Sequence, residues 1–169
     1  MKKIIDIFDN EWDLVDECLG CKIANKNVTA PFGVLFETDN FVVVQDIETP
    51  IPGFMVINCK KHIRSILDLS EEEYIELMNL SYEVRKAMGE LGDIEDVSII
   101  QKELAPHFHL WLFPRYKWMI NNSKLGLGYG KLSDYTKIIE YSRKNHKSKQ
   151  NIAEIEEYCR IIKENLENA

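Results

Sequence analysis

Two histidines lie two residues apart in an apolar, aromatic segment of this chain, residues 106–115 with the sequence PHFHLWLFPR. This composition predicts a buried strand, and successive side chains of a strand point to opposite faces. His107, His109 and Trp111 should therefore share one face. Burying an imidazole costs free energy unless a hydrogen-bond partner or a metal ion satisfies its nitrogens, so this face is the first candidate for a functional site.

His109 has the chemistry of a base or a nucleophile, because a neutral imidazole titrates near physiological pH. To attack phosphorus it needs one ring nitrogen available and the other held by an acceptor, which a rigid strand position provides. The alternative is a core histidine that is hydrogen-bonded to the backbone. Two histidines on one face, followed by Pro114 and Arg115, favour the functional interpretation. Arg115 could hold a phosphate or carboxylate, although an arginine just after a strand is usually a solvated surface charge.

Cys18 and Cys21 form a C-x-x-C pair, a spacing that is compatible with metal or redox chemistry. Together with His62 and His107 they would supply the four ligands of a Cys2His2 zinc site. The long gaps in the sequence leave convergence open, and the alternative is a pair of small buried cysteines. Asp46, at the end of an apolar segment, is either an acceptor for a sugar hydroxyl or a turn residue.

Composition limits the classes of protein that fit this chain. Its 169 residues, 45% of them hydrophobic, predict one domain, or one domain with an extension, that buries a real core. The net charge of −7 argues against a general nucleic-acid binder but not against a small nucleotide in a local pocket. The sequence contains neither a transmembrane run nor a secretory signal, so we expect a soluble cytoplasmic protein with reduced cysteines.

The pattern of hydrophobic residues predicts an α+β fold with a long helix packed on an antiparallel sheet. Strands are expected at residues 34–37, 40–47, 54–57 and 97–101, and the last of these should form a hairpin with the histidine strand. A short helix is expected within residues 10–25. Ser70 and Glu73 form a capping box that opens the long helix, which Gly89 and Gly92 end.

The C-terminal part of the chain predicts helices. We expect a loop at residues 121–130, a helix at 133–141, an exposed basic connection at 144–150 and an amphipathic helix after it. The organisation expected is therefore an α+β domain at residues 1–116 and an extension at 117–169, whose helices pack on the same domain.

From about Cys18 to Tyr116 the chain resembles the histidine triad (HIT) superfamily of nucleotide hydrolases and transferases. The shared motifs are C-x-x-C-K-I at 18–23, Asp-Ile at 46–47, Pro-Gly at 52–53, Lys-x-His at 60–62, L-D-L-S at 67–70, and H-x-H-x-H-x-x-P-R aligned on Pro114-Arg115.

This resemblance implies roles for individual residues. His109 would attack the α-phosphorus of a nucleotide and form a nucleotidyl-histidine intermediate. His107 would orient the site and join Cys18, Cys21 and His62 around zinc. Asp46, followed by Ile47, would hold the ribose. Family members are commonly homodimers, so a homodimer is expected here.

The chain departs from the family pattern in two places. Trp111 occupies the third histidine position, where the transferase branches have glutamine, and an indole cannot accept a proton. The segment before the histidines, residues 101–106, is shorter than in the family and lacks glycines, which leaves Gln101, Lys102 and Arg115 as candidates for phosphate.

Three functions remain open from the sequence. The first is a HIT-like nucleotide hydrolase or nucleotidyl transferase that works through His109. The second is a catalytically weak or inactive HIT-fold protein with structural zinc that binds a nucleotide or a partner, and Trp111 with the short segment before His107 favours it. The third is a purely structural zinc domain.

Overall fold

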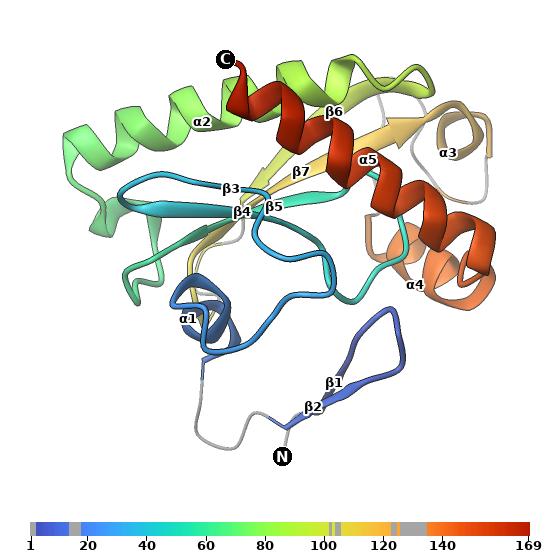
Figure 1. The fold of residues 1–169 in the computed structure, drawn as a ribbon, viewed down its shortest axis with the longest axis horizontal. Helices are drawn as coiled ribbons and strands as arrows, with labels where there is room; N and C mark the ends of the chain where they lie inside the picture. Colours follow the sequence, from blue (N-terminus) through green and yellow to red (C-terminus); the bar gives the residue numbers. More distant parts are fainter. Residues whose placement is uncertain (1–2, 14–17, 102, 104–105, 123–124, 126–134) are drawn as a thin grey trace.

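A five-stranded antiparallel sheet forms the centre of the computed structural model, which describes residues 3–13, 18–101, 103, 106–122, 125 and 135–169 (Figure 1). The strand order is β3-β4-β5-β7-β6. The strands are β3 (Phe36–Glu37), β4 (Phe41–Gln45), β5 (Met55–Cys59), β6 (Ile94–Gln101) and β7 (His109–Tyr116). β4 and β5 are buried along their whole length, as their β-branched and apolar residues require. The predicted hairpin of β6 with β7 is confirmed.

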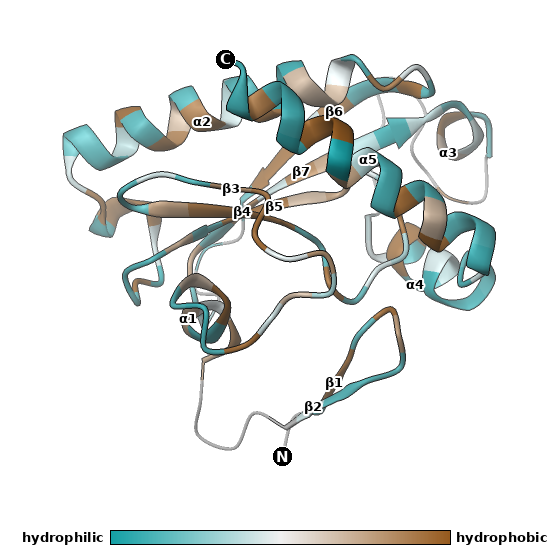
Figure 2. Cartoon of the chain, viewed as in Figure 1, coloured by the Kyte–Doolittle hydropathy of each residue, from teal (hydrophilic) through white to brown (hydrophobic). Residues whose placement is uncertain are grey.

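Two long helices, α2 (Glu71–Gly89) and α5 (Lys149–Glu167), cover one face of the sheet (Figure 1). The predicted capping box is confirmed, because the Ser70 hydroxyl accepts from the Glu73 amide and the Glu73 carboxylate accepts from the Ser70 amide. α2 buries Leu77 and Val84, and α5 buries Ile155, against the same sheet. Figure 2 shows hydrophobic and hydrophilic segments alternating along both helices, as expected for helices with one buried face.

α5 contributes Ile155, Cys159, Ile162 and Leu166 to the core beneath the sheet, whereas Met119 and Ile138 pack in a second cluster with Phe54 and Phe113. The predicted domain boundary at residue 116 stays a prediction. α3 (Lys117–Asn121), which was not predicted, begins directly after β7. α4 (Tyr135–Asn145) extends further than the predicted helix, and residues 133 and 134 lie outside the described residues, as does most of the predicted loop at 121–130. The connection before α5 is shorter than expected, because Ser148 caps that helix by accepting from the Asn151 amide.

The opposite face of the sheet carries α1 (Leu19–Ala24) and a small hairpin of β1 (Lys3–Ile5) and β2 (Glu11–Asp13) (Figure 1). The helix predicted within residues 10–25 is confirmed at Leu19–Ala24, the prediction is wrong at Glu11–Asp13, and residues 14–17 lie outside the described residues. The cause is Asp6, whose carboxylate accepts from the Phe8 and Asn10 amides and from Trp12 Nε1, and so ties this segment into a hairpin.

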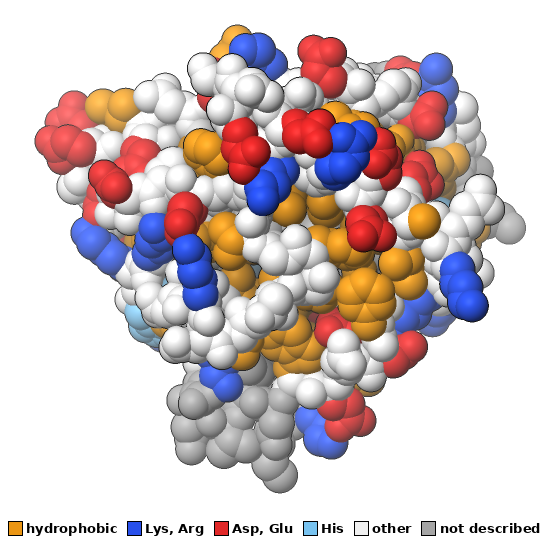
Figure 3. Space-filling model, viewed as in Figure 1, with side chains coloured by type: hydrophobic (Ala, Val, Ile, Leu, Met, Phe, Trp, Pro, Cys, Tyr) orange, Lys and Arg blue, Asp and Glu red, His pale blue; other side chains and the backbone are white. Residues whose placement is uncertain are grey.

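Two further properties concern the outer surface. Figure 3 shows Lys and Arg side chains interspersed with Asp and Glu side chains on one face, which therefore offers no continuous basic surface. Across the described residues, every helix is too short or too polar for a membrane span.

One further element, a 3-10 helix (Ile66–Asp68), connects β5 to α2.

Candidate functional site

Four sulfur and nitrogen ligands come together where α1 meets the ends of two strands. The ligand atoms of Cys18, Cys21, His62 and His107 all lie within 4.8 Å of one another, and no other such cluster exists among the described residues. Cys18 Sγ is 3.3 Å from His107 Nδ1, and Cys21 Sγ is 3.1 Å from His62 Nδ1. A tetrahedral zinc ion with N and S ligands has ligand-to-ligand edges of about 3.3–3.8 Å. The four residues therefore fit zinc.

The second nitrogen of His107 fixes how the ring faces this cluster. His107 Nε2 donates to the carbonyl oxygen of Cys59 at 2.7 Å, so Nδ1 carries the lone pair that faces the two sulfurs. Burial lowers the pKa of His107, which keeps the imidazole in the neutral form that binds metal.

Gly20 allows α1 to approach this imidazole. A Cβ atom at Gly20 would lie only 2.4 Å from Cγ and Cδ2 of His107. Any larger residue at position 20 would therefore push the helix away from the histidine.

His109, the first residue of β7, has the geometry predicted for a nucleophile. Its Nδ1 lies 2.9 Å from the carbonyl oxygen of His107. A neutral imidazole can only donate to a carbonyl, so the proton is on Nδ1 and the lone pair is on Nε2. The candidate metal ligand His107 and the candidate nucleophile His109 are thus joined by one hydrogen bond.

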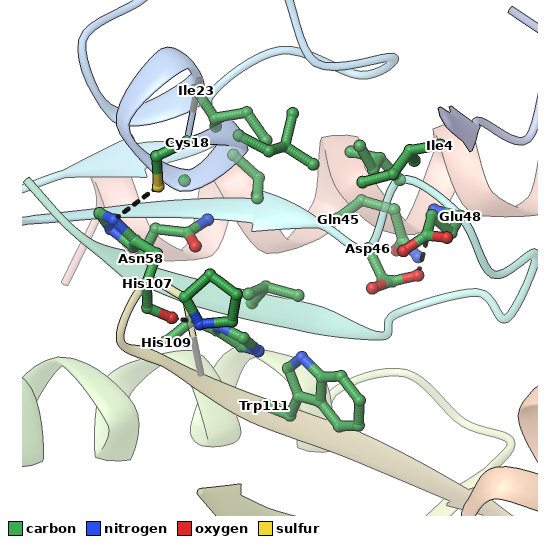
Figure 4. A pocket seen from close by; sticks show the side chains of 16 residues that line it. Ile4, Cys18, Ile23, Gln45, Asp46, Glu48, Asn58, His107, His109 and Trp111 are labelled. Carbon is green, nitrogen blue, oxygen red and sulfur yellow. Dashed lines mark hydrogen bonds between the residues drawn. The ribbon is translucent and has the colours of Figure 1, made fainter. Parts of the chain in front are cut away.

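A cavity of about 350 Å³, here called the His109 cavity, opens beside this histidine (Figure 4). Small-molecule sites in proteins commonly have volumes in this range, about 300–1,000 Å³. The polar side chains that line the cavity are Asn58, His107 and His109 at one end and Gln45, Asp46 and Glu48 at the other (Figure 4). The apolar side chains that line it are Ile4, Leu19, Ile23, Val44, Ile47 and Val56. This combination suits a ligand that has both charged or polar groups and a flat apolar part.

Asp46 stands at the end of β4 and lines the cavity (Figure 4). Its Oδ1 accepts from the amides of Thr49, at 2.7 Å, and Glu48, at 3.2 Å. Burial raises the pKa of Asp46 to about 6, and the neighbouring Glu48 carboxylate acts in the same direction. The two sequence interpretations of Asp46 are therefore compatible, since the residue forms a turn and also lines the cavity.

Trp111 lies on the same cavity wall as His109, two residues along β7. Its ring centroid is 5.7 Å from that of His109 and 5.4 Å from that of Phe54, against which it packs edge to face. Phe54 is fully buried, so the indole is held firmly in the space next to the nucleophile.

The structure does not bring the predicted phosphate ligands Gln101 and Arg115 to the His109 cavity, which neither residue lines. The Gln101 amide bonds to the Glu103 carboxylate, and Arg115 Nε lies 3.4 Å from Asp96 Oδ1 on the neighbouring strand. Lys102 lies outside the described residues. A contact of these residues with phosphate stays a prediction.

Sequence reasoning missed several residues of the cavity, among them Ile4 and Asn58. Ile4 reaches it from β1, and no local pattern announces this, because the hairpin depends on contacts of Asp6 and Trp12. Asn58 pairs with His109 across β5 and β7. The sequence signal for Asn58 was its polar side chain, because Asn58 lies two positions after Val56 and so shares a strand face with this cavity-lining residue.

The chain was compared with known proteins. A HIT-domain family model matches residues 28–118. The curated relative adenosine 5'-monophosphoramidase HINT3 from Danio rerio is 28% identical over 128 residues, which cover 67% of this chain and 79% of that protein.

Solved structures with the same fold include two histidine triad proteins. A zinc-bound histidine triad family protein from Mycobacterium smegmatis aligns with a TM-score of 0.60 at 19% identity, covering 89% of this chain and 94% of that one. A hypothetical histidine triad nucleotide-binding protein from Sulfolobus tokodaii aligns with a TM-score of 0.61 at 16% identity, covering 89% and 93%. The family model spans more than half of the sequence, including His62, His107 and His109, and the chain therefore belongs to the histidine triad (HIT) family.

Proposed function

We propose that this protein is a phosphorus-transfer enzyme that acts on a nucleotide, as a hydrolase or a nucleotidyl transferase. The observation that carries this proposal is the placement of His109, with its Nδ1–H bonded to a backbone carbonyl, on the wall of a cavity that also has an apolar side. The relative HINT3 is named for hydrolysis of an adenosine 5'-monophosphoramidate, which supports a nucleotide as the ligand.

In the first step, Nε2 of His109 attacks the α-phosphorus and a P–N bond forms. The bond from phosphorus to the leaving group breaks, and the leaving group takes the electron pair. The hydrogen bond from Nδ1 to the His107 carbonyl stabilises the positive charge that develops on the imidazole. Trp111 can donate a hydrogen bond but has no acidic proton to transfer, so the leaving group departs as an anion or takes a proton from water.

In the second step, water or another acceptor attacks the phosphorus of the nucleotidyl-histidine, a P–O bond forms and the P–N bond breaks. Nε2 of His109 takes back the electron pair, and an attacking water loses its proton to the solvent. The Asp46 carboxylate would accept a hydrogen bond from a ribose hydroxyl, and Ile47 with the other apolar residues of the cavity would contact the base. This assignment uses the polar and the apolar side chains of the cavity for the two parts of a nucleoside.

We further propose that Cys18, Cys21, His62 and His107 hold a structural zinc ion. The ion would supply rigidity, because it would join α1 to the segment that leads into β7. His107 would transmit that rigidity to His109 through its carbonyl oxygen. The zinc-bound family member from Mycobacterium smegmatis supports this metal, and elemental analysis of purified protein should find about one zinc per chain.

The test of the catalytic proposal is a covalent adduct on His109. Incubation with an adenosine 5'-phosphoramidate, followed by rapid quenching at neutral pH and mass spectrometry, should find an acid-labile nucleotidyl group on this residue. His109→Ala should abolish both adduct and turnover. His146→Ala, a histidine that does not line the His109 cavity, is the control and should retain both. An active His109→Ala variant would refute the mechanism.

A second candidate function is a HIT-fold nucleotide- or partner-binding protein with little or no catalysis. The observation that favours it is Trp111, which fills the third histidine position with a group that cannot transfer protons. This function predicts saturable nucleotide binding in calorimetry, equal for the wild type and His109→Ala, with no adduct on His109. If the chain binds no nucleotide, the functions that remain are a partner-binding protein and a structural zinc domain.

A homodimer and a cytoplasmic location are also proposed. Tyr74, Met78 and Tyr82 are exposed and follow one another at intervals of four residues on α2, which gives this helix an apolar row suited to a second copy. Light scattering after size exclusion should find twice the mass of 19.7 kDa.

The cysteines support the proposed cytoplasmic location. All four are free thiols, as expected in a reducing compartment.

A further inference from the structure

A second cavity, of about 420 Å³, lies where the end of β7 meets α3 and the start of α5. It is here called the Trp118 cavity, and none of its lining residues lines the His109 cavity. Three aromatic rings line it, those of Tyr116, Trp118 and His146. Two carboxylates, Asp93 and Glu154, line it as well. The proposed nucleotide chemistry makes no use of this set.

The rings form one contiguous cluster. The Trp118 centroid is 4.7 Å from that of His146 and 6.5 Å from that of Tyr116, whose ring plane is nearly parallel to the indole at 20°. Tyr116 is fixed because its hydroxyl donates to the Pro52 carbonyl at 2.6 Å. The faces of aromatic rings carry negative partial charge and attract cations, and tryptophan does so most strongly.

The charges around these rings favour a cation. Burial raises the pKa of Tyr158, a residue of α5, to about 12, and the negative charges of Glu154 and Asp93 act in the same direction. Both carboxylates therefore lie close enough to this ring to influence it. Burial lowers the pKa of His146, so this ring is neutral near pH 7 and does not repel a cation. Lys117 also lines the cavity, but its ammonium group lies 3.1 Å from the Glu95 carboxylate.

The arrangement of the ionisable groups argues against a metal ion and an anion. Among the described residues, the only group able to hold a metal ion is the Cys18 cluster, so Asp93, Glu154 and His146 do not converge on one point. Two carboxylates on the lining repel phosphate. What remains is a cation of larger radius, because aromatic rings and carboxylates line the same cavity.

We propose that the Trp118 cavity is a binding site for an alkylated ammonium cation, either a free small molecule or a methylated lysine side chain. Such a group has few N–H donors and therefore needs few acceptors. A guanidinium would present five donors, whereas three of the eight residues that line the cavity carry aromatic rings. The site does not depend on nucleotide hydrolysis, and its failure would leave that proposal unaffected.

The test uses the full chain and nuclear magnetic resonance of its three tryptophan indole N–H groups, assigned with single Trp→Phe variants. Tetramethylammonium chloride replaces sodium chloride at constant ionic strength. The Trp118 signal should shift saturably. The double variant Asp93→Asn/Glu154→Gln should weaken binding by about tenfold. Glu90→Gln/Glu156→Gln removes the same charge from exposed positions outside the cavity and should keep the affinity.

Three outcomes of this titration would overturn the proposal: no saturable shift of the Trp118 signal, equal affinity in the Asp93/Glu154 double variant, or tighter binding of guanidinium than of tetramethylammonium. A second titration compares choline with a short peptide that carries trimethyllysine. Saturable binding of either supports the site, and the tighter ligand identifies its source. Binding of neither overturns it.

Discussion

Replacing Gly20 with alanine should disrupt the metal centre through a single steric contact. The added Cβ would lie 2.4 Å from Cγ and Cδ2 of His107 and 2.9 Å from its Cβ. Carbon atoms in contact are normally separated by about 3.5–4.0 Å. Either the imidazole or α1 must therefore move by about 1 Å to relieve the overlap.

A movement of this size exceeds what a zinc site tolerates, because ligand distances are held within about 0.2 Å. Since α1 carries both cysteines, a shift of the helix displaces them from His62 and His107 together. Zinc affinity should therefore fall at least about tenfold, which corresponds to ~1.4 kcal/mol. The same shift alters the His107 carbonyl that holds His109, so formation of the nucleotidyl adduct should slow as well.

The assay is competition for zinc between the protein and a chromophoric chelator at fixed pH. Gly89→Ala is the matched control, because no heavy atom lies within 4 Å of a Cβ at Gly89, the last residue of α2. This control should bind zinc as the wild type does. Wild-type affinity in Gly20→Ala, or an equal loss in Gly89→Ala, would refute the steric argument.

Two pH dependences and one apolar contact complete the predictions. Burial raises the pKa of Cys21 to about 11, so zinc must displace a proton and chelator competition should show tighter binding at about pH 8 than at about pH 6. Burial raises the pKa of Asp46 to about 6, so its stabilising effect is complete below about pH 4 and is lost as the pH rises through about 6. In urea unfolding, the stability of Asp46→Asn relative to the wild type should therefore be higher at about pH 8 than at about pH 4. The same stability difference at both pH values would contradict this. Ile4→Ala should weaken nucleotide binding in calorimetry about fivefold, or ~1 kcal/mol, whereas the exposed Ile5→Ala should not; equal effects would exclude β1 from the site.

Local sequence signals predicted those parts of the fold that local chemistry determines. The capping box of Ser70 and Glu73 located the start of α2, and the β-branched run in β4 located the sheet. The alternation of side chains in β7 correctly separated the face of Trp111, which lines the His109 cavity, from that of Leu112, which lies in the core beneath α2 and α5. These features depend on neighbours within a few residues.

Features that depend on tertiary register could not be read in the same way. The sequence separation is 41 residues between Cys21 and His62 and 89 residues between Cys18 and His107. The residue types suggested this set of zinc ligands but left their convergence open, and the resemblance to the family strengthened the prediction. Arg115 illustrates the converse. It shares the predicted face of His109, but β7 continues past the cavity and the register with β6 places this arginine opposite Asp96.

Part of the lining of the His109 cavity comes from segments outside the residues that the family model matches. The family model matches residues 28–118, whereas Ile4, Cys18 and Gly20 precede this range. Lys147, which follows it, bonds to the Asp9 carboxylate and the carbonyl oxygen of residue 6, and thereby fastens the N-terminal hairpin to the C-terminal extension. The matched residues alone would retain the nucleophile but would lack two metal ligands and the β1 wall of the cavity. Differences in substrate between this chain and its relatives should therefore map to these flanking segments rather than to the histidine strand.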